Sequence, residues 1–422
     1  MQLKKVLVVG NGGREHALIS KIKDSPLLGK IYTTNPEFSR FAEHIKADPT
    51  NHLYLSSICK SEEIDLVVVG QERYLENGIT DALTAEGVAV FGPTKNAAKL
   101  ESSKFFAKEI AEMQGTPTAR YAFCSSPNNL RKQIESIGDF PVVIKANGLA
   151  SGKGVVMCGT MDEALQVGEA MLNGMFGAAS KNIIVEEFLQ GEELSYFVLV
   201  DGQTVLPIGY ARDHKQVTHQ GKTYNTGGMG AYSPAPISTK VEQEILGRII
   251  YPTISALSSI NIRYKGVLFA GLMLTNSGPK LLEYNVRFGD PETQAILSRL
   301  EGDLLDLMFK TVGGELDRAS ISFSDDVSLS VVLATQGYPV DYKTGYHING
   351  DNLERAINAV DGLQIFNAGI KYDENGNMLS NGGRVLNLVV KGSSLNDCKR
   401  KAKQAIDIID WKEGFCLQEL TT

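Results

Sequence analysis

The most informative segment of the chain is Leu281-Leu282-Glu283-Tyr284-Asn285-Val286-Arg287-Phe288-Gly289-Asp290-Pro291-Glu292-Thr293-Gln294. Apolar and polar residues alternate through its first part, which predicts a β-strand with one buried and one polar face. The predicted strand runs over Lys280–Phe288, is broken by Asp290-Pro291, and is followed by a helix from Thr293 to Leu300. The buried face would carry Leu282, Tyr284, Val286 and Phe288. The polar face would carry Glu283, Asn285 and Arg287.

This polar face has the chemistry of a metal and phosphate site. A carboxylate and an amide oxygen two residues apart suit Mg²⁺, which takes few protein ligands and leaves its other positions to phosphate and water. An arginine one step further along can hold phosphate oxygens in a bidentate manner. A solvent-facing strand edge would explain these three residues equally well, so the interpretation depends on other parts of the chain.

The composition is that of an ordinary soluble globular protein. The 422 residues are 43% hydrophobic and 22% charged, which allows two or three domains with a large core. The formal net charge of −7 argues against general nucleic-acid binding. Five scattered cysteines without C-x₂-C spacing argue against a disulfide framework or a zinc site. With no apolar leader and no stretch of membrane-spanning length, we expect a cytoplasmic protein without membrane partners.

The N-terminal segment predicts a doubly wound parallel sheet. A buried strand at Lys4–Val9 is followed by the glycine turn Gly10-Asn11-Gly12-Gly13 and then a helical pattern. Glycines let the backbone approach an anion at a helix N-terminus, although a lone turn of this kind most simply serves strand-to-helix geometry. Glu15 stands where a dinucleotide-binding fingerprint needs a third glycine, which disfavours an NAD site. Further strands are expected at Lys30–Thr33, Leu66–Val69 and Val88–Phe91.

The next part of the chain predicts a phosphate-binding hairpin. One long amphipathic helix is expected from Lys95 to Met113. Downstream, a strand ends in Lys145, a loop with three glycines carries Lys153, and a second strand starts at Val155. Glycines expose backbone N–H groups, and lysines supply point charges, so the hairpin is suited to cover a triphosphate. A hairpin with only surface lysines would leave a strand-buried Lys145 with an unpaired charge, which favours phosphate binding.

Two later segments are candidates for ligand contacts. Ile183–Ser195 predicts a strand, a turn and a second strand. The backbone at 186–189 could pair with an adenine edge and Glu193 with a ribose hydroxyl, although such acids are most often solvated. The glycine-rich loop Asn225–Pro234 indicates a backbone that moves or closely approaches a ligand. From about Ser328 the pattern predicts a smaller α/β unit.

Together these segments resemble the glycinamide ribonucleotide synthetase family of ATP-grasp carboxylate–amine ligases, over nearly the full length. The resemblance is carried by 10–17, 145–155, 186–193, 213–215, 225–234, 283–294, 337–339, 368–369 and 381–385. It implies an α/β and α+β protein in which ATP is clamped between two β-sheets. The implied domains are a Rossmann-like N-terminal domain at 1–101, an ATP-grasp domain at 102–325 with a lid at about 118–190, and a C-terminal domain at 326–422.

The resemblance also implies roles for individual residues. ATP phosphates would be contacted by Lys104, Lys145 and Lys153. The nucleoside would be contacted by Glu186, Glu187, Phe188, Leu189 and Glu193. Mg²⁺ or Mn²⁺ would be held by Glu283 and Asn285. Groups near the reacting carboxylate would be Asp213, Lys215, Arg287 and Asp290. Further substrate contacts would come from Gly10, Asn11, Gly12, Gly13, Glu15, Asn225, Thr226, Gly227, Gly228 and Met229.

The implied reaction activates glycine with ATP to glycyl phosphate, from which the amine of phosphoribosylamine displaces phosphate. Glycine and phosphoribosylamine would be the partners of a monomer or weak dimer. Two alternatives remain: a ligase paralogue that uses another amine or small carboxylate, and a nucleotide-binding regulatory protein without turnover. A regulatory protein that only binds a nucleotide does not need a metal site and an arginine at the transferring phosphate, which disfavours this alternative.

Several segments depart from the family pattern. They are Thr33–Glu37, Gly70–Arg73, Thr218–Tyr224, Asn147 in place of an aspartate, and the tail Trp411–Thr422. Most of these segments are expected where the phosphoribosyl substrate would bind, whereas the ATP and metal segments are intact.

Overall fold

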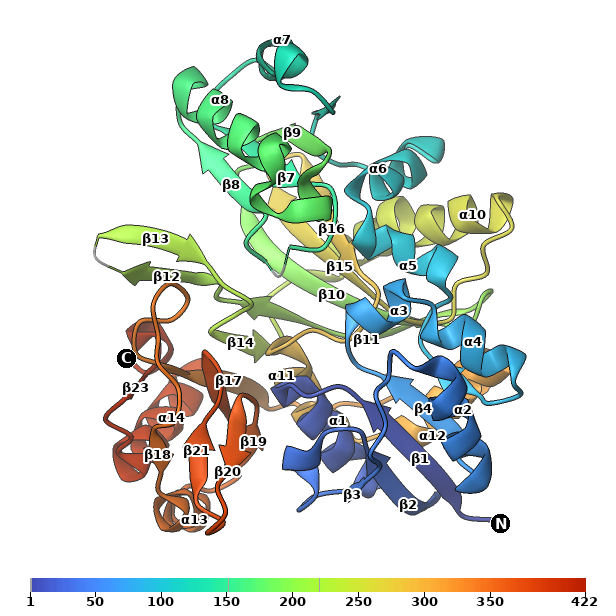
Figure 1. The fold of residues 1–422 in the computed structure, drawn as a ribbon, viewed down its shortest axis with the longest axis vertical. Helices are drawn as coiled ribbons and strands as arrows, with labels where there is room; N and C mark the ends of the chain where they lie inside the picture. Colours follow the sequence, from blue (N-terminus) through green and yellow to red (C-terminus); the bar gives the residue numbers. More distant parts are fainter. Residues whose placement is uncertain (1, 151, 220) are drawn as a thin grey trace.

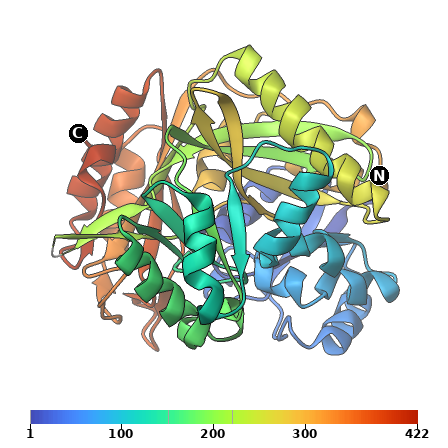
Figure 2. The ribbon, with the colours of Figure 1, turned by 90° about the horizontal axis from the view of Figure 1, so that it is seen from above.

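The computed structural model describes residues 2–150, 152–219 and 221–422. Ser151 of the glycine hairpin and Gln220 of the 218–224 segment therefore lie outside the described residues. Figure 1 shows an N-terminal sheet with its helices, a small lid above the centre, a large central sheet, and a C-terminal part that flanks it. Seen from above in Figure 2, the N-terminal and C-terminal parts lie on opposite sides of the central sheet. Among the described residues, no helix combines the length and the apolar character needed to cross a membrane.

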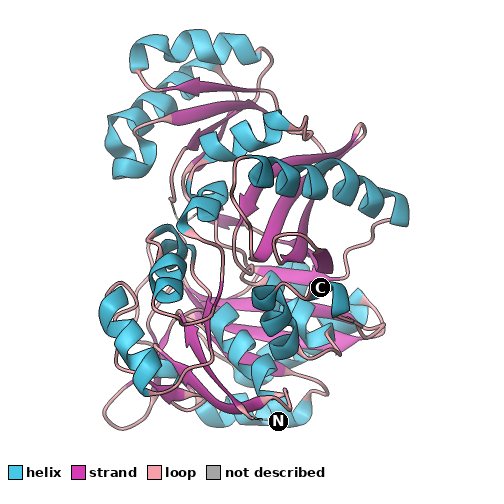
Figure 3. Ribbon diagram, turned by 90° about the vertical axis from the view of Figure 1, so that its right-hand side faces the viewer, coloured by secondary structure: helices cyan, strands magenta, loops and turns pink. Residues whose placement is uncertain are grey.

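The N-terminal part is a parallel sheet, as predicted, and its five strands have the order β3-β2-β1-β4-β5. Its strands are β1 (Lys4–Val9), β2 (Leu28–Thr33), β3 (Glu43–His44), β4 (Leu66–Val69) and β5 (Val90–Phe91). Its helices are α1 (Gly13–Lys23), α2 (His52–Ser61), α3 (Glu72–Glu76) and α4 (Ile79–Ala85), with a 3₁₀ turn η1 at Pro36–Phe38. The apolar residues of β1 and β4 are buried because parallel strands carry helices on both faces, which are drawn in cyan in Figure 3.

The predicted single helix over Lys95–Met113 is wrong, because the chain forms α5 (Lys95–Ser102) and α6 (Lys104–Met113) with a break at Ser103. Ser103 has extended backbone angles (φ −141°, ψ 106°), and its hydroxyl accepts the N–H of Phe106 at 3.3 Å. Serine is a favoured residue at a helix N-cap. The apolar spacing continues across the break, so periodicity alone did not reveal it.

The lid is a four-stranded antiparallel sheet with the order β6-β9-β7-β8. Its strands are β6 (Tyr121–Cys124), β7 (Val142–Ala146), β8 (Val155–Cys158) and β9 (Ile183–Glu187). Two helices, α7 (Pro127–Ile137) and α8 (Met161–Ala170), pack on it through a separate apolar core that includes Leu130, Ile144 and Val185. The short helices η2 (Met171–Met175) and η3 (Gly177–Ser180) lead back to β9. The predicted hairpin over β7 and β8 is confirmed.

The central sheet is antiparallel and has the strand order β16-β15-β10-β11-β14-β17-β22-β19, with β23 paired to β17. Its strands are β10 (Glu192–Val200), β11 (Val205–Asp213), β14 (Gly230–Ser233), β15 (Gly266–Thr275), β16 (Gly278–Asn285), β17 (Val327–Thr335), β19 (Gln364–Asn367), β22 (Arg384–Gly392) and β23 (Gly414–Phe415). The pairing of β14 with β17 joins the C-terminal strands to the central sheet. The main strands of the predicted C-terminal unit are therefore part of the central sheet.

The remaining elements surround this sheet. The helices are α9 (Thr239–Ile245), η4 (Leu246–Ile250), α10 (Tyr251–Ser259), α11 (Glu292–Arg299), α12 (Leu304–Gly313), η5 (Leu316–Arg318), α13 (Gly350–Ala359), α14 (Leu395–Ile409) and η6 (Gln418–Leu420). Two smaller sheets contain β12 (Gln216–His219) with β13 (Lys222–Asn225), and β18 (His347–Ile348) with β21 (Met378–Ser380) and β20 (Ile370–Tyr372).

Strand β16 differs from its prediction in two ways. It ends at Asn285 rather than at Phe288, so Arg287 lies beyond the strand. A bulge at Leu282 leaves Glu283 opposite Gly271 and Leu281 opposite Leu272. Because one extra residue reverses the alternation, Leu281 rather than Leu282 joins the main core with Tyr284, while Leu282 packs on a small cluster of Ala119, Leu189 and Met273.

Candidate active site

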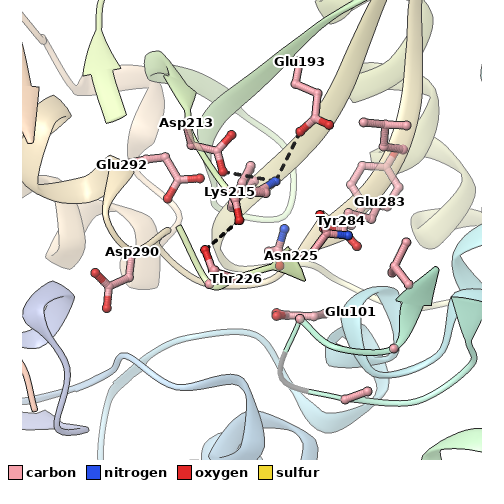
Figure 4. A pocket seen from close by; sticks show the side chains of 18 of the residues that line it. Glu101, Glu193, Asp213, Lys215, Asn225, Thr226, Glu283, Tyr284, Asp290 and Glu292 are labelled. Atoms are coloured by element: carbon pink, nitrogen blue, oxygen red, sulfur yellow. Dashed lines mark hydrogen bonds and ion pairs between the residues drawn. The ribbon is translucent and has the colours of Figure 1, made fainter. Parts of the chain in front are cut away.

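A cavity of about 1090 Å³ lies between the lid, the central sheet and the N-terminal part, and Figure 4 shows its centre. Most of the predicted site residues line it: Asn11, Gly12, Lys104, Lys145, Glu186, Glu187, Phe188, Leu189, Glu193, Asp213, Lys215, Asn225, Thr226, Gly227, Glu283, Asn285, Arg287 and Asp290. Six do not: Gly10, Gly13, Glu15, Lys153, Gly228 and Met229. The fold therefore brings segments from across the chain into one space.

The lid end of the cavity contains a buried group of three charges. Lys145 Nζ lies 2.7 Å from one carboxylate oxygen of Glu186, and Lys108 Nζ lies 3.0 Å from the other. The premise that Lys145 would be unpaired is therefore wrong, since Glu186 neutralises it. Burial alone would raise the pKa of Glu186, but the two lysines hold it below its ordinary value. Two lysines and one glutamate leave a net positive charge, which suits a phosphate.

Lysines on α6 add to this end of the cavity. Lys104, the first residue of α6, lines the cavity, and its pKa is lowered by burial and by Lys145, against the opposing effect of Glu283. Lys108 was missed by sequence reasoning, although its position one helical turn after Lys104 places both lysines on one face. Lys153 is exposed and outside the cavity lining.

An apolar slot lies beside these charges. Leu189 and Met273 are buried and form a cluster with Leu282, and all three line the cavity. Phe188 is 40% exposed at the edge. The carboxylate of Glu187 is held by Arg120 at 2.8 Å and Lys280 at 3.4 Å. A flat heterocycle could therefore bind against apolar side chains.

Glu283 and Asn285 fit a divalent cation that also binds phosphate. The structure gives Glu283 no hydrogen-bond donor among the described residues, and Asn285 Oδ1 accepts a bond from Arg287 at 3.1 Å. Burial would raise the pKa of Glu283, but Lys104 and Lys215 hold it below its ordinary value. No group of three His, Cys, Asp or Glu side chains that could hold a metal occurs in the described ranges. Two protein oxygens would leave the other coordination positions of the metal to phosphate and water, which matches the preference of Mg²⁺.

Arg287 is held by two glutamates that sequence reasoning missed. Its Nε lies 3.1 Å from Glu72 of α3, and its Nη2 lies 2.8 Å from Glu101 of α5. A further bond goes to the carbonyl oxygen of Phe288 at 3.2 Å. Burial raises the pKa of Glu101 to about 7, although Arg287 opposes this shift. The guanidinium therefore links the N-terminal part, helix α5 and Asn285.

A second charged group lies at the centre of the cavity (Figure 4). Lys215 Nζ is 3.2 Å from Asp213 and 3.6 Å from Glu193. The Asp213 side chain is 2% exposed and accepts no hydrogen bond from the described residues. Glu292, also missed, lies beside Asp213 and accepts the Ser195 hydroxyl at 3.1 Å. Burial and the nearby Asp213 raise the pKa of Glu292 to about 7.

The glycine turn forms the far end of the cavity. Glu15 is buried behind the turn, where its carboxylate accepts the N–H of Gly12 at 2.6 Å and pairs with Arg14 at 2.8 Å. Gly10 has φ +136°, and a Cβ there would lie 2.6 Å from the Glu15 side chain, so glycine is required. Gln71 donates a hydrogen bond to Asn11. Glu15 thus shapes the turn from outside the cavity lining.

Arg384, another residue that was missed, fixes the glycine-rich loop before β14. It donates to the carbonyl oxygens of Gly227 at 2.9 Å and Asp290 at 2.6 Å, and its other nitrogen lies 3.3 Å from the Asp290 carboxylate. Met229 is fully buried behind the loop, and Gly228 packs against Pro291. Arg384 stands in a segment that carries the family resemblance, which was the available signal.

The segments that depart from the family pattern fall into two groups. Gln71, Glu72 and Arg73 line the cavity, as does Glu419 of the tail, which lies 2.7 Å from His214. The described residues of Thr33–Glu37 and Thr218–Tyr224 do not line it. Only some of the segments that depart from the family pattern therefore line the cavity.

Comparisons with known proteins agree with this arrangement. Three family models match consecutive parts of the chain: the phosphoribosylglycinamide synthetase N domain at residues 4–101, its ATP-grasp (A) domain at 102–293, and its C domain at 328–418. A phosphoribosylamine–glycine ligase from Mesorhizobium japonicum is 46% identical over 98% of this chain and 97% of its own. One from Brucella melitensis is 44% identical over 97% and 96%.

A solved structure supports the same assignment. The crystal structure of phosphoribosylamine–glycine ligase from Thermotoga maritima superposes with a TM-score of 0.81 at 27% identity, covering 98% of each chain. With this fold, this cavity and these relatives, the chain belongs to the phosphoribosylglycinamide synthetase family of ATP-dependent ligases.

Proposed function

We propose that the protein joins glycine to 5-phosphoribosylamine at the expense of ATP, giving glycinamide ribonucleotide, ADP and phosphate in purine biosynthesis. The observation that carries this proposal is a single cavity with a cationic, slot-like end, a glycine-turn end, and Glu283 and Asn285 between them. The names of the relatives support the choice of substrates. We expect the enzyme to act in the cytoplasm as a monomer or weak dimer.

At the lid end, Lys104 and Lys145 bind the phosphates while the slot of Leu189, Met273 and Leu282 takes the adenine. The backbone at 186–189 pairs with the adenine edge, and Glu193 takes a ribose hydroxyl. Glu283 and Asn285 would hold Mg²⁺ or Mn²⁺, which would supply charge neutralisation at the phosphate that is transferred. Lys153 joins the phosphates when the hairpin loop closes.

The first chemical step activates glycine. A carboxylate oxygen of glycine attacks the γ-phosphorus of ATP, the bond to the ADP oxygen breaks, and glycyl phosphate forms. Lys215 and Arg287 would stabilise the negative charge that develops, and Asp213 and Asp290 would bind beside the amino acid. All four residues line the cavity. The covering lid excludes water, which would otherwise hydrolyse glycyl phosphate.

The second step uses the opposite end of the cavity. The turn at Asn11 and Gly12 and the loop at Asn225–Gly227 bind phosphoribosylamine, held in place by Glu15 and Arg384. The amine attacks the carbonyl carbon of glycyl phosphate, the carbon–oxygen bond to phosphate breaks, and the proton lost by the amine is taken up by the released phosphate. Because the glycyl phosphate formed at one end must then meet the amine, the nucleotide and the amine bind at separate ends of the same cavity.

A second candidate is a ligase that accepts a different amine. It is favoured by Gln71 and Arg73, which line the cavity in a segment where the chain departs from the family pattern.

An ADP-release assay tests both candidates. We expect release only when glycine and phosphoribosylamine are both present, with formation of glycinamide ribonucleotide. Release with glycine and other amines, but not with phosphoribosylamine, would replace the first candidate by the second. No ATP consumption with any amine or small carboxylate would reject ligase activity.

A further inference from the structure

Asn147 joins the glycine hairpin to the start of α6. It follows β7 directly, and its side-chain oxygen accepts the N–H of Phe105 at 2.9 Å and lies 3.4 Å from the Ser103 hydroxyl. Its carbonyl oxygen accepts the N–H of Lys104 at 3.0 Å. Its own N–H donates to the carbonyl oxygen of Asn182 at 3.1 Å. One residue of the lid therefore holds two consecutive backbone groups of a helix outside the lid.

These bonds complete the N-terminus of α6. The first four N–H groups of a helix have no partner within the helix. In α6 these are the N–H groups of the N-cap Ser103 and of the next three residues. That of Ser103 donates to the carbonyl oxygen of Lys99 at 2.9 Å, those of Lys104 and Phe105 donate to Asn147, and that of Phe106 donates to the Ser103 hydroxyl at 3.3 Å. Two of these four N–H groups are thus bound by a residue of the lid.

The cap closes a ring around the phosphate end of the cavity. Lys145 lies two residues before Asn147 on β7 and pairs with Glu186. Glu186 pairs in turn with Lys108 of α6, and the first residue of α6 is Lys104. Two links between the lid and the helix, one through charges and one through Asn147, act on the same three lysines. Strand β6 adds further contacts with α6, since the ring centroids of Phe123 and Phe105 lie 3.8 Å apart and Tyr121 bonds to Glu112. Among these links, the bond from Asn147 is the one that holds the backbone of Lys104.

The hairpin loop is anchored at the same place. Gly148 donates to the carbonyl oxygen of Ala179 at 2.8 Å, and a Cβ at Gly148 would lie 2.9 Å from the Ala179 Cα. Further along, Gly152 has φ +74° and a Cβ there would meet nothing closer than 3.5 Å. The fixed end of the loop is therefore at 147–148, and glycine freedom is found beyond it.

We propose that Asn147 is a positioning residue that sets the spacing of Lys104 and Lys145 and so forms the phosphate site before the nucleotide binds. This inference rests on the proposed use of ATP. A pre-formed site avoids the cost of ordering charged side chains when ligand binds. Loss of the side-chain oxygen leaves the Phe105 N–H without its partner and frees the start of α6 to move.

The test compares Asn147→Ala, Asn147→Asp and the control Asn182→Ala. Asn182 is adjacent in space, and its side chain makes no hydrogen bond among the described residues. Calorimetric titration with Mg-ADP measures affinity, steady-state kinetics give KM for ATP and glycine, and hydrogen exchange follows the amides of Lys104 and Phe105. We expect Asn147→Ala to weaken ADP binding and raise KM for ATP about tenfold, which corresponds to about 1.4 kcal/mol and lies within the range for loss of one capping bond.

In the same variant the KM for glycine should change less than twofold, and amide exchange at the start of α6 should rise. Asn147→Asp keeps an acceptor at the same position, so it should remain within about threefold of the parent protein. Asn182→Ala should behave as the parent does. If Asn147→Ala does not fold, Asn147→Gln, which moves the oxygen by one methylene, takes its place with the same expectation.

Unchanged ADP affinity in the Ala or Gln variant, or an Asp variant as weak as Ala, would overturn the positioning role. Equal increases in KM for ATP and glycine would also overturn it, because they would indicate a general structural defect. ADP binding does not require phosphoribosylamine, so these outcomes are separate from a failure of the proposed function, which would show as absent product formation by the parent protein.

Discussion

The two ends of the cavity are built differently. At the lid end, Lys145, Glu186 and Lys108 form buried ion pairs within the lid and the adjacent helix α6. At the glycine-turn end, backbone groups dominate: Arg384 of β22 holds the carbonyl oxygens of Gly227 and Asp290, and Glu15 holds the N–H of Gly12. The lid end is lined by fixed charges. The other end is lined by backbone groups whose positions are held by side chains such as Arg384 of the C-terminal part.

This difference teaches how each end tolerates sequence change. A phosphate site made of point charges depends on a few lysines at defined positions. A surface made of backbone groups depends instead on the residues that support the loops, so the lining residues can vary. The departures at Gln71 and Arg73 lie at the second kind of surface.

The largest effect is expected at the junction of the two ends. Glu283→Ala should lower kcat by about 10³-fold or more, because charge on the transferred phosphate loses several kcal/mol of stabilisation. Steady-state ADP release measures it, with Glu244→Ala on the outer helix α9 as the matched control. Turnover near that of the parent protein would discard Glu283 as a metal ligand.

Arg384→Ala tests whether the ends are independent. Loss of its bonds to Gly227 and Asp290 should loosen the loop and raise KM for phosphoribosylamine about 30-fold, as expected for the loss of about 2 kcal/mol from bonds to a charged group. ADP affinity should change less than twofold. Arg400→Ala is the control, because the Arg400 side chain on α14 is 67% exposed. An equal loss of ADP affinity would show that the two ends are coupled.

Lys153→Ala tests whether the hairpin loop belongs to the lid end. Lys153 is outside the cavity lining, so the proposed contact with the phosphates would require the loop to close. Its removal should raise KM for ATP about tenfold through loss of one charge-assisted contact. Kinetics with varied ATP measure the change, and Lys132→Ala on α7 is the control. Unchanged KM and kcat would remove Lys153 from the phosphate contacts.

The smallest effect concerns the pKa values of two buried glutamates, Glu292 and Glu72. The pKa of Glu292 is raised from 4.5 to about 7, by burial first and by Asp213 second. The folded state therefore binds this proton more tightly, so the stability that it contributes is present below pH 4.5 and is lost as pH rises to 7. Glu292→Gln should reduce the fall in Tm between pH 5 and 8 by about 2 °C.

Glu72 provides the comparison of opposite sign. Burial would raise its pKa, but Arg287 and Arg14 lower it to about 2, so its contribution is present above pH 4.5 and is lost only as pH falls towards 2. Glu72→Gln should therefore change the slope of Tm between pH 5 and 8 only indirectly, through Glu101, whose pKa the Glu72 charge helps to raise. Melting curves across this range measure both variants, and identical slopes in the parent protein and Glu292→Gln would contradict the assigned ionisation.

Much of the site could be predicted because its signals are local. The strand Lys4–Val9, the glycine turn and the hairpin of β7 and β8 follow from apolar periodicity and glycine placement over a few residues. The break at Ser103 and the bulge at Leu282 were missed, since neither interrupts the apolar pattern. The bulge decides that Leu281 joins the main core and Leu282 the small cluster with Met273.

The sequence by itself determined the chemical types in the site: lysines on a glycine hairpin, and an acid and an amide on one strand. Only the tertiary structure decided their partners. Arg287 bonds to Glu72 and Glu101, which are 215 and 186 positions away in the chain. Local patterns specify periodicity and backbone freedom, whereas the pairing of buried charges depends on which distant elements pack together, because a buried charge is stable only beside its partner.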